Sequence, residues 1–481
     1  MTQDFKFALR SLLQHPAFAA TAILSLALGI GANTAIFTLT HQVLLRVLPV
    51  KDPQRLVSLT WTGQFIGGST RGFLDSFSYP MYADLRDSSR AFTGLAAQFQ
   101  SIVDLTDNGP AQRANAELVS GNYFDVLGVT AAIGRTLTPA DDKLPGGEPY
   151  IVLSYDYWQK RFGGNPSVRN RSIDLNGHPM TILGVAEPGF QGSEMLSPAD
   201  VFVPLAMKTV VTPTWDDMRR RNSIWLKLFA RLKAGVSYAA AESSLAAPFH
   251  AALENDLAAV ARDRKFSERY VKNRLRLVSA SQGFGNMREF FSKPLYVLLA
   301  MVGTLLLIVC VNVANLFITR AAARQKEVAI RLALGAARAS LIRLLMTESV
   351  LIALVSGALG LLLSGWIAAL LVSLLPFDHV GEAIRTSPDL RILALTAGLS
   401  LLTALAAGLA PALEATRPSL APSLKNESRA ASLGVGQTRL RRVLVAGQIA
   451  LSFLLLAAAG LFARSLYKVM TVDSGIDAAV C

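Results

Sequence analysis

The sequence is poor in the residues that build metal and disulfide sites. It holds two cysteines, Cys310 inside an apolar run and Cys481 at the end of the chain. Two such thiols provide neither a disulfide framework nor a cysteine-based metal site. The five histidines are scattered, and no pair has the spacing of ligands on one helix face. We therefore predict no metal and no cofactor.

Motifs for nucleophilic catalysis and phosphate binding are also missing. There is no GxSxG nucleophile elbow, and Gly163-Gly164 is not followed by Lys-Ser or Lys-Thr. Two pairs of carboxylates, Asp141-Asp142 and Asp216-Asp217, could serve as acid/base groups or cation ligands. Each lies in a turn-like stretch with proline, so we expect solvated loop charges instead. The chain is predicted not to be an enzyme and not to bind ATP through a Walker motif.

Charge is scarce and unevenly placed. Only 17% of residues are charged, 52% are hydrophobic, and the formal net charge is +13. The Lys and Arg residues concentrate beside long apolar runs rather than on one basic surface with interleaved aromatics, so nucleic acid is not an expected partner. A mean hydropathy of +0.38 instead indicates a membrane protein.

Five apolar stretches are long enough to cross the hydrocarbon core as helices. The first follows Lys6 and Arg10, but it is too long for a signal peptide and lacks a clear cleavage signature. We read it as a retained helix. The five predicted spans are 18–39, 295–318, 350–374, 392–413 and 443–463.

The distribution of basic residues predicts the orientation. Stretches 320–343 and 414–442 each carry six Lys or Arg residues, whereas 376–389 carries Asp378, Glu382 and Asp389 with one Arg385. The positive-inside rule then places the N-terminus and both basic loops in the cytoplasm and the large middle region outside. No Asp, Glu or Lys lies at a span centre, which argues against ion-coupled transport.

Small and polar residues recur within the spans. Ser356, Gly360 and Ser364 follow one another at helical spacing, a pattern that lets helix backbones approach closely in lipid. Asn312 and Asn315 lie one turn apart at membrane depth. They could mark a substrate path, but interhelical hydrogen bonding is the preferred interpretation because neither is ionisable.

The region from Leu48 to Phe291 reads as a soluble α+β domain. Asn176-Gly177 between two β-rich segments predicts a hairpin, because both turn positions need positive φ. Residues 223–232 alternate like a strand, Ser237 is expected to cap a helix to about Glu254, and 275–280 is β-rich. The pattern does not decide between one lobe and two; a boundary would fall near 139–149.

A charged helical hairpin is predicted after the second span. Arg320, Arg324, Glu327 and Arg331 form a stripe at roughly helical spacing. Gly335 can end this helix, and a second amphipathic helix containing Arg338 leads to Glu348. The same charges would suit two roles: an anchor on anionic lipid headgroups, or a docking element for a cytoplasmic partner.

Three long motifs carry a resemblance to a known family. They are RQKEVAIRLALGAAR at 324–338 followed by Glu348-Ser349, VSGNYFDVLG at 119–128 followed by Gly134-Arg135, and LSYDYWQKRFG at 153–163. With the first span at 10–36, these motifs resemble the MacB/FtsX-like permeases of ABC transporters, and most closely the acidobacterial-type permeases in which that unit occurs twice.

The resemblance implies an α-helical multi-pass membrane protein with a large α+β extracytoplasmic domain. In order along the chain, we expect a cytoplasmic N-terminus at 1–16, a first span at 17–40, a MacB-like periplasmic core domain at 41–292, an FtsX-like permease unit at 293–415 with its coupling hairpin at 319–347, a cytoplasmic linker at 416–442, a fifth span at 443–464 and an extracytoplasmic tail at 465–481. Residues 439–468 resemble the opening span of a second unit, so we expect a chain truncated or split after its first unit.

The resemblance also implies a function and partners. In the family, the hairpin contacts a separate ATPase subunit, which makes Arg320, Arg324, Glu327, Arg331, Gly335, Arg338 and Glu348 the expected coupling residues. A homo- or heterodimer of permease units in the bacterial inner membrane is expected, with export or extraction of macrolides, peptides or lipoproteins as family possibilities. The alternative function is a membrane-anchored sensor of an extracytoplasmic ligand.

Overall fold

The computed structural model describes residues 2–63, 75–88, 90–107, 109–143, 148–195, 197–259, 264–284, 286–323, 330, 338–373, 393–402, 405 and 435–470. The chain divides into two compact units. The first, called here the membrane unit, comprises Met1–Val43 and Phe290–Cys481. The second, called here the external domain, comprises Leu44–Glu289.

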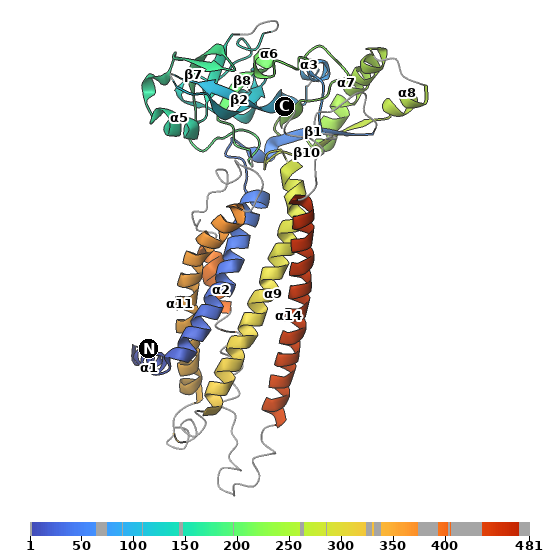
Figure 1. The fold of residues 1–481 in the computed structure, drawn as a ribbon. Coiled ribbons are helices and arrows are strands. Elements are labelled where there is room, and N and C mark those ends of the chain that lie inside the picture. Colours follow the sequence, from blue (N-terminus) through green and yellow to red (C-terminus); the bar gives the residue numbers. More distant parts are fainter. Residues whose placement is uncertain are drawn as a thin grey trace. The chain divides into compact units, whose positions relative to one another are not determined.

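The external domain is built on one ten-stranded mixed sheet (Figure 1). Its main path runs β10-β1-β9-β2-β3-β8-β5-β7-β4, and β6 pairs with β2 and β7. The strands are β1 (Leu56–Thr62), β2 (Phe92–Thr106), β3 (Gln112–Val119), β4 (Ala131–Gly134), β5 (Tyr150–Leu153), β6 (Ser172–Leu175), β7 (His178–Ala186), β8 (Val201–Pro204), β9 (Lys227–Leu232) and β10 (Arg274–Ser279).

Helices pack along this sheet. Figure 1 shows α5 (Tyr155–Phe162) beside β7, and α7 (Tyr238–Ala259) close to β10, as their contacts confirm. The remaining helical elements are η2 (Pro53–Arg55), α3 (Tyr79–Asp87), α4 (Tyr123–Leu127), η3 (Pro166–Val168), η4 (Leu205–Met207), α6 (Lys208–Val211) and α8 (Arg264–Tyr270). Since one sheet extends to both sides of residues 139–149, these residues are not a boundary between two lobes.

The first and last strands of the external domain are neighbours. β1 and β10 pair antiparallel from Val57↔Ser279 to Thr62↔Arg274. Before β1, the backbone N–H of Leu48 donates to the carbonyl of Ser281 at 2.9 Å. The chain therefore enters and leaves this domain through paired segments. The segment before β1 lies beside the segment that leads from β10 toward α9 (Asn286–Ala323).

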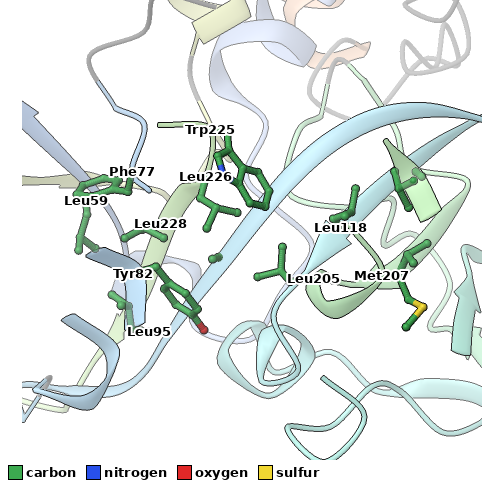
Figure 2. Packing of buried hydrophobic residues seen from close by; sticks show 14 of the residues in the cluster. Leu59, Phe77, Tyr82, Leu95, Leu118, Leu205, Met207, Trp225, Leu226 and Leu228 are labelled. Carbon is green, nitrogen blue, oxygen red and sulfur yellow. The ribbon is translucent and has the colours of Figure 1, made fainter. Parts of the chain in front are cut away.

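Alternation of apolar residues along the strands gives the domain its core. Figure 2 shows side chains from separate elements gathered in this core, among them Leu59 of β1, Tyr82 of α3, Leu95 of β2 and Leu228 of β9. All four are at most 1% exposed. Burying large side chains of this kind is the dominant favourable contribution to folding of a soluble domain.

Local sequence signals predicted several of these elements. The hairpin between β6 and β7 is confirmed: Asn176 and Gly177 have φ of 51° and 80°, and Leu175 faces His178. Ser237 accepts a hydrogen bond from the N–H of Ala240 at 3.3 Å, ahead of α7. The strand expected over 223–232 begins only at Lys227, because Leu226 instead forms an isolated bridge to Phe77.

The described part of the membrane unit consists mainly of long helices (Figure 1). They are α1 (Thr2–Gln14), α2 (Pro16–Thr40) with a π-helical end η1 (His41–Leu45), α9, α11 (Arg338–Ser373), residues 393–402 and α14 (Val435–Met470). Four are long and apolar enough to cross a membrane: Pro16–Leu45, Ser292–Arg320, Ile342–Ser373 and Val445–Ser465. Of the span predicted at 392–413, the helix Leu393–Leu402 is described, and about half of the span lies outside the described residues.

Helices α2, α9 and α11 share one apolar core. Leu26 and Ile30 of α2 are buried in it together with Val313 of α9 and Ile352 of α11. In lipid the hydrophobic effect does not drive such contacts, so packing and interhelical hydrogen bonds hold the helices together.

Candidate functional site

The candidate site surrounds Arg320, in the last turn of α9. The Arg320 side chain is 11% exposed, and its Nη1 lies 3.9 Å from Oε2 of Glu348, which is 1% exposed on α11. An arginine cannot lose its charge inside a protein, so a buried guanidinium needs opposite charge and hydrogen-bond acceptors around it. Glu348 supplies the charge.

Two further helices complete these surroundings. Arg320 Nη2 donates to the backbone carbonyl of Ser11 at 3.1 Å and to Ser11 Oγ at 2.8 Å, both from α1. The guanidinium carbon lies 4.4 Å from the ring centroid of Phe18 on α2, within range of a cation–π interaction. One side chain thus contacts α1, α2 and α11 from α9. We call this set of residues (Ser11, Phe18, Arg320 and Glu348) the arginine junction.

The structure brings together the two ends of the predicted coupling hairpin. Arg320 and Glu348, far apart in the sequence, are partners. Arg338 is the first residue of α11. Arg324, Glu327, Arg331 and Gly335 lie outside the described residues, so their coupling role stays a prediction. Ser11 and Phe18 were not predicted from the sequence, because nothing in their local pattern indicates a distant arginine.

A close helix crossing lies deeper in the membrane unit. A Cβ added to Gly31 of α2 would lie 3.0 Å from the carbonyl oxygen of Gly360 on α11, and one added to Gly360 would lie 3.0 Å from that of Ala27. A side chain at either position would crowd the facing backbone, so glycine favours this close crossing. Gly360 belongs to the predicted small-residue row; its partner Gly31 was not predicted.

The other members of that row bond within their own helix. Ser356 Oγ donates to the carbonyl of Ile352 at 2.7 Å, and Ser364 Oγ donates to that of Leu361 at 2.7 Å. Both serines are buried, so this bonding satisfies their hydroxyl donors without a partner helix.

Two further hydrogen bonds between helices involve residues of the first span. Asn33 Nδ2 donates to the carbonyl of Val302 on α9 at 2.7 Å, and the hydroxyls of Thr34 and Thr396 lie 3.2 Å apart. The bridging role foreseen for Asn312 and Asn315 stays a prediction. Asn315 Oδ1 is buried and accepts no hydrogen bond from the residues that the structure describes.

The external domain uses carboxylates to hold its loops. Arg135 binds both oxygens of Asp141, at 2.6 and 2.8 Å, and this contact lowers the pKa of Asp141 to about 2. Asp142 accepts from the N–H groups of Gly121 and Ala206, and burial raises its pKa to about 6. The expectation of solvated loop charges is therefore wrong for this pair, because tertiary contacts enclose it.

Among the residues that the structure describes, no group of three or more His, Cys, Asp or Glu side chains could hold a metal ion. In the second carboxylate pair, Asp216-Asp217, the Oδ2 of Asp217 accepts a hydrogen bond from Ser223 Oγ at 2.7 Å. These contacts hold loops of the external domain in place.

Two family models match the chain in succession. Residues 19–247 match the MacB-like periplasmic core domain, and residues 299–420 match the FtsX-like permease C-terminal domain. The first match covers most of α2 and most of the external domain, and the second covers most of α9 and all of α11.

Curated relatives include the macrolide export ATP-binding/permease protein MacB of Escherichia coli strain K12 and that of Shigella flexneri. Each is 29% identical over 274 residues, which is 56% of this chain and 37% of the relative. The match thus spans little more than a third of each relative's length.

Two solved structures align with part of the chain at low TM-scores. A domain of a permease protein from Porphyromonas gingivalis aligns with a TM-score of 0.34 at 14% identity, covering 50% of this chain and 98% of that domain. The periplasmic region of MacB from Actinobacillus actinomycetemcomitans aligns with a TM-score of 0.34 at 13% identity, covering 50% and 94%. From the two family models and the MacB relatives, the chain belongs to the MacB/FtsX-like permease family of ABC transporters.

Proposed function

We propose that this chain is a permease subunit of an ABC-type transporter. A separate cytoplasmic ATPase hydrolyses ATP, and the permease converts that cycle into movement of its external domain for export or extraction of a substrate. The observation that carries the proposal is the order of the two family matches along one chain, a periplasmic core domain followed by a permease domain. The chain itself is proposed to have no enzymatic activity.

The arginine junction supports a coupling role for the hairpin. Arg320 and Glu348 stand on either side of residues 324–337, so a force applied to that segment reaches both of their helices. Since Arg320 also binds Ser11 and faces Phe18, a displacement of α9 at this point would affect α1 and α2 as well. Hydrogen bonds and ion pairs between helices, as in this junction, can carry energetic coupling between them.

The proposal includes an orientation and an assembly. Basic residues at 320–343 and 414–442 favour a cytoplasmic N-terminus and hairpin, with the external domain in the periplasm. We propose a dimer of permease units, homo- or heteromeric, because ABC motors work as pairs of ATPase domains. The curated relatives are named for macrolide export, and macrolides are accordingly one candidate substrate class for this chain.

Co-purification tests the proposal. The chain is extracted from its native membrane in mild detergent, its partners are identified by mass spectrometry, and the eluate is assayed for ATP hydrolysis. We expect an ATP-binding subunit with the wild type and its loss with Glu327→Arg and with Gly335→Pro. Glu254→Arg, the same charge reversal at an exposed position of α7, is the matched control and should retain the partner.

The second candidate function is a membrane-anchored sensor of an extracytoplasmic ligand, favoured by the large folded domain at Leu44–Glu289. A sensor has no need for an ATPase. Recovery of no ATP-binding subunit with the intact chain would overturn the permease proposal and favour the sensor.

A further inference from the structure

The external domain contains a fully buried carboxyl group. Glu117 of β3 has 0% exposure. Its Oε1 accepts hydrogen bonds from Tyr123 Oη at 2.9 Å and from Ser193 Oγ at 2.6 Å, and its Oε2 accepts from the Ser193 N–H at 3.3 Å. Hydrogen bonds alone seldom offset the loss of hydration of a buried charge.

The charged groups around Glu117 do not neutralise it. Tyr123 comes from α4, and Glu194 follows Ser193 and carries the same charge as Glu117. The nearby Lys227 of β9 is held by Glu194, with Nζ 2.6 Å from Oε1. The neighbouring strand β8 places Phe202 opposite Glu117, and β2 places Gln100 there. Among the described residues, Glu117 therefore has no ion-pair partner, and burial raises its pKa to about 7.

The segment that covers Glu117 fits closely over it. Gly192 has φ of 98°, and a Cβ at this position would lie 2.3 Å from Glu117 Oε2. Only a glycine in this conformation lets the backbone approach the carboxyl so closely. Release of Gly192 and Ser193 would replace this contact with water.

The same segment holds the residues that lead into α9. The N–H of Phe284 donates to the carbonyl of Ser193 at 3.2 Å, and the Phe284 ring packs on Phe229 of β9 with centroids 5.4 Å apart. Phe284 precedes α9 by two residues. A series of contacts thus runs from Glu117 through Ser193 to Phe284, close in sequence to this helix.

We propose that Glu117 is a proton-controlled switch that holds residues 191–193, and through them residues 283–284, against the sheet. Protonated Glu117 keeps the segment in place, because a neutral carboxyl is stable without a cation and can donate to the hydroxyl of Ser193 or Tyr123. Loss of the proton leaves a buried, unbalanced charge, which is relieved when the segment opens and water reaches the carboxylate. Periplasmic pH would then set how firmly the lead into α9 is attached.

The sign of the pH dependence follows from linkage. The pKa of Glu117 is raised in the closed state, from an ordinary value of 4.5 to about 7. The closed segment is therefore most stable below about pH 4.5 and loses that stability as the pH rises through about 7. Between pH 5 and pH 8 the opening equilibrium should increase roughly tenfold to hundredfold.

Hydrogen exchange of the full chain in lipid nanodiscs tests the proposal. Peptides covering Ser193 and Phe284 are followed by mass spectrometry from pH 5 to pH 8, and the rates are converted to protection factors so that the intrinsic pH effect is removed. We expect protection of both amides to fall over this range in the wild type and to stay constant in Glu117→Gln. Glu254→Gln, an exposed carboxylate on α7, is the matched control and should behave as the wild type.

A second variant keeps the test decisive if Glu117→Gln does not fold. Tyr123→Phe removes a hydrogen bond that favours the ionised carboxylate, so the fall in protection should move to higher pH. Protection that is independent of pH in the wild type, or an identical fall in Glu117→Gln, would overturn the proposal. The readout is local, so it is independent of whether an ATPase partner is found.

Discussion

The interactions that stabilise the external domain differ from those that stabilise the membrane unit. The external domain buries titratable groups within a mixed sheet: Asp142, Asp256 and Glu117 all have raised pKa values because of burial. In the membrane unit, the described helices meet through a glycine crossing, an asparagine bridge and one arginine junction. We therefore expect pH to act on the external domain through these buried carboxyls, and single substitutions at helix contacts to act on the membrane unit.

The largest expected effect in the membrane unit comes from breaking the arginine junction. Arg320→Ala leaves Glu348 buried without the charge of Arg320, and breaking a buried pair in this way costs about 3–5 kcal/mol. The free energy of unfolding of the membrane unit in mixed micelles measures this loss. The double variant Arg320→Met/Glu348→Leu should be more stable than Arg320→Ala; equal stability would contradict the ion-pair interpretation.

The glycine crossing is expected to be the next most sensitive contact. Gly360→Val forces a side chain against the backbone of α2, which should destabilise the membrane unit by about 1–3 kcal/mol. Gly365→Val in the same helix is the matched control, because an added Cβ there meets nothing within 4 Å. If both variants unfold at the same detergent concentration, α2 and α11 do not cross at Gly31 and Gly360.

A pH prediction separates the two units. Asp256 binds Arg221 at 3.1 Å and Tyr270 at 3.0 Å, yet burial raises its pKa to about 6. Because the pKa of Asp256 is raised in the folded state, its contribution to stability is full below about pH 3.8 and is lost as the pH rises through about 6.

The external domain should therefore unfold at a lower temperature at pH 7.5 than at pH 5, and the membrane unit should show no comparable change. Asp256→Asn should reduce this pH effect by about 1–2 kcal/mol. Differential scanning calorimetry of the full chain in nanodiscs measures both transitions. A pH effect of equal size in both units would contradict the expectation that the external domain is the more pH-sensitive unit.

The smallest expected effect concerns the asparagine bridge. Asn33→Leu removes the hydrogen bond to the carbonyl of Val302, and such bonds in membranes contribute about 0.5–1 kcal/mol. Thr21→Leu is the control, since the exposed Thr21 hydroxyl bonds only to its own helix at Ala17. Indistinguishable unfolding of the two variants would show that Asn33 adds no interhelical stability.

Local signals predicted much of the fold. The Asn176-Gly177 turn and the Ser237 cap were identified because a two-residue hairpin needs positive φ and a helix start needs a side-chain acceptor. The pairing of strands that are distant in the sequence could not be predicted from local signals. The parallel pairing of β3 with β8 and the pairing of the terminal strands β1 and β10 join segments about 85 and 220 residues apart, and strand periodicity does not select between such partners.

The same limit applies to the candidate site. Arg320, Glu348 and Gly360 were identified from charge and small-residue spacing within one segment. Ser11, Phe18, Gly31 and Asn33 belong to the first helices, and their importance arises only from contacts with α9 and α11. Asp141 and Asp142 were misread because turn composition predicts exposure, whereas Arg135 and the backbone of Ala206 enclose them.

The most direct test of the account is a distance measurement on the complex recovered with its ATPase. Cys310 and Cys481 are replaced by serine, and a single spin label is attached at Ile102→Cys, an exposed position of the external domain. In a dimer, pulsed electron paramagnetic resonance then measures the distance between the spin labels on the two external domains. We predict that this distance distribution shifts between the nucleotide-free state and the state with a non-hydrolysable ATP analogue. An unchanged distribution in a complex that still hydrolyses ATP would contradict mechanical coupling to the external domain.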